Sequence, residues 1–321
     1  MPEKNPRVSI GLPVYNGENY LAEAIDSILA QTFEDFELII SDNASTDRTQ
    51  EICEAYAAKD GRIRYYRSEV NKGSAWNFNR VFELARGEYF KWAAHDDYIA
   101  PEYLARAVEV LDQDPSVVLS YPRVTIVDEK RNHILDYTLK LPTDSPSPAV
   151  RFRSLLLDWS MCFEIFGLIR TSALKQTPVM GNYGHADGVL LARLGLLGRF
   201  EEIPEVLFFS RRHAKQSNRM FGLSESGGNN YHLYTVWFDP TKAGKIIFPY
   251  WRMFKEFLTS LWMYPLDLKT RLLGHFYMLI WIRKNARHLI SDLIVAAKDL
   301  SYRLRGGLQT STEKPFERGQ V

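Results

Sequence analysis

The sequence predicts an α/β fold in which a mostly parallel sheet is flanked by helices and followed by a helical extension. Strand-like apolar runs alternate with amphipathic helical stretches through residues 1–100, the rhythm of parallel strands joined by crossover helices. Turn-forming residues follow each strand-like run. Because ligands of such sheets bind beyond the carboxyl ends of the strands, we expect these loops to form one site.

The expected elements follow from apolar periodicity. In residues 1–100 the pattern predicts strands at 8–13, 36–41, 62–67 and 89–93, and helices at 20–30, 47–58 and 75–85. Beyond residue 100 it predicts helices at 101–111 and 188–197, and strands at 117–121, 124–127 and 206–210. A loop is expected at 141–148, which contains three prolines.

Composition excludes several classes of protein. The 321 residues carry a net charge of only +1, so no nucleic-acid partner is expected. Cys53 and Cys162 lack the spacing of a metal or disulfide motif, which favours small apolar packing in a reducing compartment. The N-terminus has no signal-peptide pattern. The longest uncharged runs of the tail, 257–266 and 272–282, are shorter than the ~20 residues that span a bilayer.

Two adjacent carboxylates, Asp96 and Asp97, follow the predicted buried strand 89–93. Such a pair is costly at the exit of a buried strand unless a cation is present. Oxygen ligands suit Mg²⁺ or Mn²⁺, and these ions commonly hold the phosphates of a substrate. A surface turn before the next helix is the alternative interpretation. The strand in front and the converging loops favour metal binding.

Five segments, in order, resemble the family 2 glycosyltransferases, which are inverting enzymes of the GT-A fold. The segments are 8–16 (VSIGLPVYN), 38–49 (LIISDNASTDRT), 71–89 with its Asn-Lys-Gly start and ARGEY end, 95–98 (HDDY) and 186–188 (ADG). The resemblance runs from about residue 7 to residue 213. It implies a GT-A catalytic domain over 1–240, with a nucleotide-sugar half at about 1–100 and an acceptor half at about 101–240.

The resemblance also implies roles for residues of the nucleotide-sugar half. Asp42 would accept a hydrogen bond from the imide N–H of uracil or thymine, so a UDP- or dTDP-sugar donor is favoured; an Asx-turn is its alternative role. Pro13, Tyr15 and Asn16 would form the wall beside the base and ribose. Lys72 would reach the base or the phosphates, and a solvated lysine is the alternative.

The metal motif of the family corresponds here to residues 94–97. Asp96 would be the ligand of Mg²⁺ or Mn²⁺, and Asp97 would assist it or cap the following turn. His95 is the variable position of the motif and would lie in the nucleotide-sugar site. The first position, usually an Asp that contacts ribose, is Ala94 in this chain, so donor affinity or choice is expected to differ from the common pattern.

Asp187 occupies the place of the family's general base, which would take the acceptor proton during a single in-line displacement. Its preceding Glu is replaced by Ala186. A helix-capping role for Asp187 is compatible with catalysis. Near residue 210, Arg212 and His213 are expected to grip the diphosphate, whereas strand alternation turns Arg211 away. A sheet-edge charge cluster is the alternative for these residues.

Charge is distributed unevenly along the chain. Residues 1–100 hold 11 Lys/Arg and 17 Asp/Glu, whereas residues 241–310 hold 12 and 4. The basic, aromatic segment 241–305 is expected to form amphipathic helices, and 306–321 a disordered tail. Residues 246–305 suit peripheral contact with anionic lipid at the inner face of the plasma membrane of a cytoplasmic protein. Packing on the catalytic domain and a homodimer interface are the alternatives.

These observations predict an inverting, metal-dependent glycosyltransferase that moves a sugar from a nucleoside-diphosphate sugar to a glycan or lipid-linked acceptor in surface polysaccharide or glycolipid synthesis. A nucleotidyltransferase-like enzyme is disfavoured, because 13–17 lacks the expected Gly-rich loop with Arg and Lys. A catalytically impaired nucleotide- or glycan-binding scaffold is conceivable from Ala94 and Ala186. The retained Asp42, Asp96 and Asp187 argue against that alternative.

Overall fold

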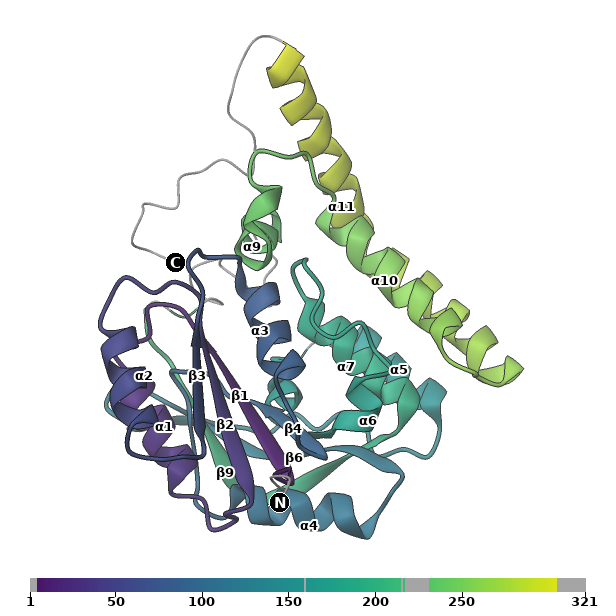
Figure 1. The fold of residues 1–321 in the computed structure, drawn as a ribbon. Helices are drawn as coiled ribbons and strands as arrows, with labels where there is room; N and C mark the ends of the chain where they lie inside the picture. Colours follow the sequence, from purple (N-terminus) through teal and green to yellow (C-terminus); the bar gives the residue numbers. More distant parts are fainter. Residues whose placement is uncertain (1–4, 159, 215, 217–230, 305–321) are drawn as a thin grey trace.

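The computed structural model describes residues 5–158, 160–214, 216 and 231–304. Within these residues one nine-stranded sheet has the order β3-β2-β1-β4-β8-β6-β9-β5, with β7 paired to β6 (Figure 1). The first elements are β1 (Val8–Val14), α1 (Leu21–Leu29), β2 (Phe36–Asp42), α2 (Thr49–Ala57), β3 (Ile63–Arg67), α3 (Ser74–Glu83) and β4 (Tyr89–Trp92). The predicted alternation of strands and helices is confirmed here, and β1 pairs parallel with both β2 and β4.

The second half of the sheet is mixed rather than mostly parallel. Its elements are β5 (Tyr98–Ile99), α4 (Tyr103–Gln113), β6 (Val117–Val127), β7 (His133–Tyr137), α5 (Pro148–Leu157), η1 (Phe163–Phe166), β8 (Leu168–Arg170), α6 (Thr171–Leu174), α7 (Ala186–Leu197) and β9 (Arg199–Arg211). Strand β8 pairs antiparallel with β4 and β6, and β5 pairs antiparallel with β9, while β6 and β9 run parallel.

Two predicted strands, 117–121 and 124–127, are one strand, β6, which continues through Pro122. Its register against β9 shifts on both sides of Arg123, and a proline is tolerated in a strand at such an irregularity. The predicted strand at 206–210 is the end of β9, whose first part contains Pro204 and several charged residues. The first part of β9 was not predicted as a strand, because its charged residues and proline interrupt the apolar pattern.

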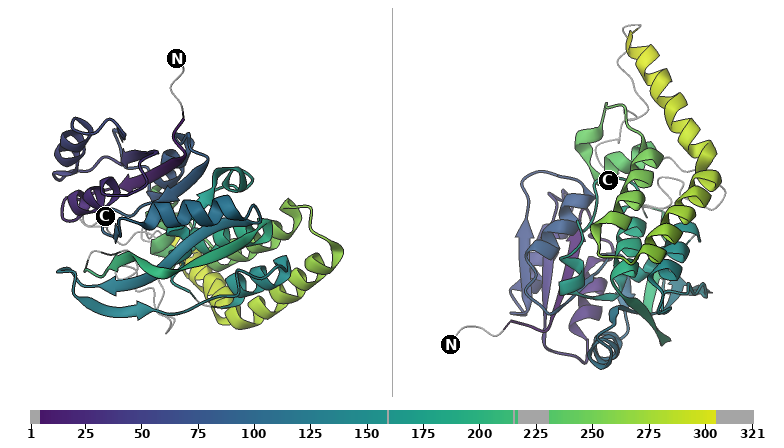
Figure 2. Two further views of the ribbon diagram at one scale, coloured as in Figure 1. Left: turned by 90° about the horizontal axis from the view of Figure 1, so that it is seen from below. Right: turned by 90° about the vertical axis from the view of Figure 1, so that its right-hand side faces the viewer.

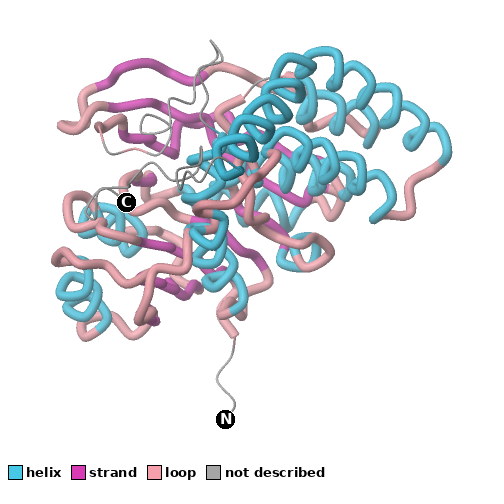
Figure 3. The backbone as a smooth tube through the Cα atoms, turned by 90° about the horizontal axis from the view of Figure 1, so that it is seen from above, coloured by secondary structure: helices cyan, strands magenta, loops and turns pink. Residues whose placement is uncertain are grey.

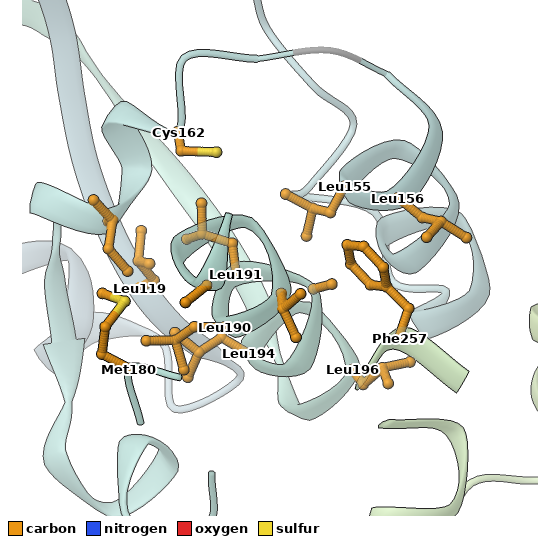
Figure 4. Close-up of a cluster of buried hydrophobic side chains, with 14 of the residues drawn as sticks. Leu119, Leu155, Leu156, Cys162, Met180, Leu190, Leu191, Leu194, Leu196 and Phe257 are labelled. Atoms are coloured by element: carbon orange, nitrogen blue, oxygen red, sulfur yellow. The ribbon is translucent and has the colours of Figure 1, made fainter. Parts of the chain in front are cut away.

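Helices cover both faces of the sheet (Figure 2). Alternate residues of β1, such as Val8 and Ile10, pack with residues of α1 and α4. The opposite face packs against α3, α5 and α7, and Figure 4 shows part of that core around Leu190, Leu191 and Leu194 of α7. Burial on both faces explains the nearly continuous apolar runs of the first strands.

The C-terminal helices belong to the same core. They are α9 (Tyr231–Phe238), η2 (Pro240–Lys242), α10 (Pro249–Met263) and α11 (Leu268–Leu304). Phe257 and Leu261 of α10 and Trp281 of α11 are buried with the residues of α5 and α7. Figure 3 shows the two long helices side by side at the edge of the molecule. The predicted tail, 306–321, lies outside the described residues.

No helix within the described ranges combines the length and the apolar character that crossing a membrane requires.

Candidate active site

The carboxyl ends of three parallel strands meet at one edge of the sheet. Val14 at the end of β1 pairs in register with Asp42 at the end of β2, and β4 runs beside β1 toward residues 94–97. Helix α9 reaches the same edge, because a Cβ on Gly73 would lie 2.5 Å from the carbonyl oxygen of Phe238. The loops predicted to converge at this edge therefore do so.

Side chains tie the first two loops together. The backbone N–H of Asn16 donates to the hydroxyl of Ser45, and the Asn16 Oδ1 accepts from the backbone N–H of Thr46 at 2.8 Å. Asn16 has a φ of 51°, in the left-handed region that Asn tolerates. His95 packs against this turn, since a Cβ on Gly17 would lie 2.8 Å from its ring. The turn at Asn16 and Gly17, which follows Pro13 and Tyr15, is thus fixed beside His95.

Asp42 is fully buried, with an exposed fraction of 0%. Its Oδ1 accepts from the backbone N–H of Ser45 at 2.8 Å, and its Oδ2 accepts from the Tyr65 hydroxyl at 2.9 Å and lies 3.2 Å from Nε of Arg67. The carboxylate therefore supports its own loop. A nucleobase would reach it only if Tyr65 or Arg67 moved, so the geometry favours the Asx-turn alternative.

Two asparagines that the sequence pattern did not single out as site residues hold the neighbouring loops. The Asn43 side chain accepts from the backbone N–H of Lys72 at 2.9 Å and donates to Asn71 and to the carbonyl of Gly73. The Asn77 amide donates to the carbonyl oxygens of Val14 and Ser41. A signal was present, since amides at strand ends and in the first turn of a helix commonly satisfy loop backbone groups.

Lys72 and Arg212 are more accessible than these supports. The Lys72 side chain is exposed and its Nζ lies 4.5 Å from the centre of the Trp76 ring. Lys72 and Trp76 also line a cavity of about 430 Å³. Arg212 is half-buried, and its backbone N–H donates to the carbonyl of Val127. The side chains of Lys72 and Arg212 thus lie next to the carboxyl edge and are not buried beneath it.

Asp96 and His213 form the central pair of the site. Nε2 of His213 lies 2.8 Å from Oδ2 of Asp96, and the exposed fractions of the two side chains are 8% and 14%. Tyr20 packs on the other side, with its ring centre 5.0 Å from that of His213. The pair offers one carboxylate and one imidazole at the edge, an arrangement that could bind a divalent cation.

Arg211 fixes this pair from behind, contrary to the expectation that it turns away. It is buried, its Nε donates to the carbonyl of Asp96 at 2.9 Å, and its terminal nitrogen contacts Glu23 at 2.6 Å. The backbone N–H of Arg211 donates to Oδ1 of Asp97 at 2.8 Å. Asp97 is buried as well, so it supports the loop while Asp96 faces the edge.

The pKa values of the adjacent carboxyl groups of Asp96 and Asp97 are shifted in opposite directions. Burial acts to raise the pKa of Asp96, but the charge of His95 and the hydrogen bond from His213 outweigh it and lower the pKa. Burial, together with the charge of Asp96, holds the pKa of Asp97 well above its ordinary value. One carboxylate therefore stays ionised where a cation would bind, which fits a divalent ion on Asp96.

Asp187 lies in the first turn of α7, because this helix begins two residues before the predicted helix at 188–197. Its Oδ1 accepts from the backbone N–H of Gly188 at 2.8 Å, and the exposed fraction of its side chain is 28%. His185, with a φ of 64°, places Nδ1 at 3.8 Å from the same oxygen. Asp187 is thus capable of both a helix-capping and a proton-accepting role.

The mixed α/β sheet, with titratable side chains in the loops at its carboxyl edge, agrees with the expected GT-A fold. The chain belongs to the family described as glycosyl transferase family 2, whose model matches residues 9–177, just over half of the chain. The expected resemblance is confirmed.

Relatives of known sequence agree with this assignment. An uncharacterized glycosyltransferase of Rickettsia typhi is 37% identical over 131 residues, which cover 40% of each chain. The glycosyltransferase GlyG of Streptococcus pneumoniae is 34% identical over 113 residues, covering 35% of this chain and 38% of its own. These matches thus span about two fifths of the relatives' length.

Solved structures show the same fold over most of the chain. S. aureus TarS 1–349 in complex with UDP has a TM-score of 0.51 at 18% identity and covers 93% of this chain and 92% of its own. The mannosyltransferase PcManGT of Pyrobaculum calidifontis, in complex with GDP-Man and Mn²⁺, has a TM-score of 0.52 at 18% identity and covers 95% of this chain and 77% of its own.

Proposed function

We propose that this protein is an inverting, metal-dependent glycosyltransferase that uses a nucleoside-diphosphate sugar. Family membership supports the reaction type. The UDP complex of TarS and the GDP-Man and Mn²⁺ complex of PcManGT support a nucleotide-sugar donor and a divalent ion. The UDP complex of TarS, rather than Asp42, supports a UDP-sugar as the donor, with a dTDP-sugar as the related choice, and the acceptor is a hydroxyl of a glycan or of a lipid-linked acceptor.

The observation that carries the proposal is the ionised Asp96 held by His213 at the carboxyl edge. Asp96 would hold Mg²⁺ or Mn²⁺, with Asp97 fixed behind it by the backbone of Arg211. When bound, the ion neutralises the charge that builds on the leaving diphosphate. Lys72 and Arg212 add positive charge beside the diphosphate.

Asp187 acts as the general base. The acceptor oxygen forms a bond to the anomeric carbon while its proton moves to the Asp187 carboxylate, and the bond from that carbon to the diphosphate oxygen breaks. The nucleoside diphosphate leaves with the bonding electron pair. Attack from the side opposite the leaving group inverts the configuration of the anomeric carbon.

Ligand-induced stabilisation, followed by an assay of transfer, tests the proposal. UDP, dTDP and GDP are added with and without Mn²⁺, and a nucleotide at 100 times its Kd raises the free energy of unfolding by about 2.7 kcal/mol. We expect a Mn²⁺-dependent rise in Tm with UDP or dTDP, and its loss in Asp96→Asn. The exposed Asp144→Asn is the matched control. A Mn²⁺-dependent rise that survives in Asp96→Asn would contradict the metal assignment.

We also propose that α11 contacts anionic lipid, within the expected range 246–305. Leu268, Leu272, Phe276 and Leu279 recur at helical spacing and are exposed, with fractions of 56% and 65% for Phe276 and Leu279. The acidic residues of α11, Asp292 and Asp299, are buried, so its exposed charges are basic. Apolar side chains next to basic ones are typical of helices that lie in the membrane interface.

A further inference from the structure

Three side chains with metal-binding chemistry meet at the start of α7, and none of them belongs to the Asp96–His213 pair. One ligand atom each from Cys162, His185 and Asp187 lies within 4.8 Å of the other two. Cys162 comes from the segment before η1, and His185 and Asp187 come from the start of α7. Figure 4 labels Cys162 near the leucines of α7. The sequence did not reveal this group, because 22 residues separate the cysteine from the histidine.

The fold holds the cysteine in place. Cys162 has a φ of 54° and directly precedes η1. The end of η1 is fixed because the carbonyl oxygen of Phe166 accepts from Nζ of Lys91 at 2.5 Å and from the Tyr103 hydroxyl at 2.8 Å. Lys91 and Tyr103 are both buried. The thiol therefore belongs to a segment that is anchored to the sheet.

The histidine is held by close packing. A Cβ on Gly188 would lie 2.2 Å from Nε2 of His185, so the imidazole occupies the space that only a glycine leaves open. The ring centre of Phe257 lies 6.4 Å from that of His185. With Nε2 turned to Gly188, Nδ1 is the nitrogen that lies 3.8 Å from Oδ1 of Asp187. The imidazole and the carboxylate thus face one another.

The donor set selects the ion. Thiolate, imidazole and carboxylate together are ligands of Zn²⁺, whereas Mg²⁺ and Mn²⁺ prefer oxygen. Ligand atoms of a tetrahedral Zn²⁺ site lie roughly 3.3–3.7 Å apart, given bond lengths of about 2.0–2.3 Å. The distance from His185 to Asp187 is already close to this value, and small rotations would bring in Cys162. A thiolate and a carboxylate balance the charge of the ion, which suits a partly buried site.

We propose that Cys162, His185 and Asp187 form a Zn²⁺ site and that Zn²⁺ bound there inhibits the enzyme. Binding displaces the thiol proton to solvent and leaves a fourth coordination position open. The inhibition, unlike the binding, rests on the proposed function, because it follows from Asp187 being the general base. A carboxylate that coordinates Zn²⁺ is not free to take the acceptor proton.

Cobalt binding to the metal-free full-length chain tests the site. Co²⁺ replaces Zn²⁺ and reports a thiolate ligand through a near-ultraviolet charge-transfer band. We expect this band, and its loss on addition of Zn²⁺, in the wild type and in Cys53→Ser, the matched control for the other buried cysteine. Cys162→Ser should lack the band and bind Zn²⁺ at least tenfold more weakly.

His185→Asn is the second variant, because Asn tolerates the left-handed backbone of this position. It should also bind Zn²⁺ at least tenfold more weakly, with unfolding curves confirming that each variant is folded. Undiminished Zn²⁺ affinity in folded Cys162→Ser or His185→Asn would overturn the site. If Cys162→Ser does not fold, His185→Asn alone decides.

Transfer assays separate this inference from the proposed function. With Mn²⁺ saturating, Zn²⁺ should inhibit the wild type and Cys53→Ser, and Cys162→Ser should need at least tenfold more Zn²⁺ for the same fractional loss of its own activity. Zn²⁺ that binds through Cys162 without inhibiting would overturn the inhibition and the role of Asp187, but not the site. Equal inhibition of wild type and Cys162→Ser would refute inhibition through this site.

Discussion

The carboxylates of Asp96 and Asp187 belong to two regions that are built in opposite ways. The carboxyl edge around Asp96 is fixed by side chains of distant segments, with Arg211 behind the loop and His213 on the carboxylate itself. Around Asp187, the carboxylate accepts from its own neighbour, Gly188, and its side chain is twice as exposed as that of Asp96, at 28% against 14%.

This difference fits two different tasks. A carboxylate that is to hold a cation benefits from a fixed position and a lowered pKa. It is then already in place and ionised before the ion binds. A carboxylate that is to accept a proton from a variable acceptor needs room and access.

Asp187→Asn should lower kcat by about 10²- to 10⁴-fold, because an amide does not accept the acceptor proton. Donor binding, measured by the Mn²⁺-dependent rise in Tm with the nucleotide, should stay unchanged, since the carboxyl edge is intact. Asp144→Asn, an exposed position, serves as the control. An unchanged kcat in Asp187→Asn would remove this residue from the mechanism, and its greater exposure would then have no link to proton transfer.

Arg211→Met should lower the free energy of unfolding by roughly 3 kcal/mol, measured by urea denaturation. The change removes one of the two arginine partners of Glu23, the other being Arg131, and the donors to the carbonyl oxygens of Asp96 and Glu129. Arg212→Met is the adjacent control, where we expect a change within about 0.5 kcal/mol together with weaker nucleotide binding. Similar stabilities of the two variants would mean that the edge is not held through Arg211.

The contribution of Asp292 to the free energy of unfolding should fall as the pH rises. Burial raises its pKa to about 6, while the carboxylate accepts from the N–H groups of Tyr250 and Trp251 at the start of α10. Since the folded pKa exceeds the unfolded value of about 3.9, the folded state binds the proton more tightly, and stability is lost between about pH 4 and pH 6. This loss amounts to at most about 3 kcal/mol.

Asp292→Asn keeps a side-chain oxygen as acceptor but cannot ionise. Relative to the wild type, it should therefore gain stability as the pH rises from 4 to 7, as measured by urea denaturation at each pH. A parallel pH dependence in the two proteins would show that Asp292 is not the group responsible. His232, whose Nε2 lies 3.9 Å from Oδ1 of Asp292, is the next titratable side chain to vary in that case.

Substitutions on α11 should change membrane binding with little effect on folding. Phe276→Glu and Leu279→Glu lie on the exposed stripe, so their stabilities should stay within about 0.5 kcal/mol of the wild type. The wild type should co-sediment with anionic vesicles in a salt-sensitive manner, and the variants should not. Ser291→Glu, at a position that is also exposed on α11, controls for added charge. Equal sedimentation of all proteins would contradict lipid contact.

Removing the C-terminal helices, in a chain that ends near residue 240, would not be a clean test of lipid contact. Phe257 and Leu261 of α10 and Trp281 of α11 share the core with α5 and α7, so a shortened chain would expose that core. The packing alternative for this extension is therefore present in the structure, and lipid contact concerns only the face of α11 that remains exposed.

The order of strands and helices through residue 92, and the sheet edge at which their loops converge, could be predicted from the sequence alone. These features depend on local periodicity and on turn residues next to strands, which a linear pattern records directly. Asp96 and His213 are candidates because they follow predicted strands, whereas Asp187 is a candidate because of the family resemblance of residues 186–188.

Contacts in the folded chain show which side chains support the loops and which face the edge. Alternation along β9 could not show that Arg211 reaches Glu23, nor could spacing show that Tyr65 and Arg67 cover Asp42. The antiparallel pairing of β8 and the meeting of Cys162 with His185 likewise join distant segments. The physical reason is that burial and hydrogen-bond partners are properties of the packed chain, set by contacts between residues far apart in sequence.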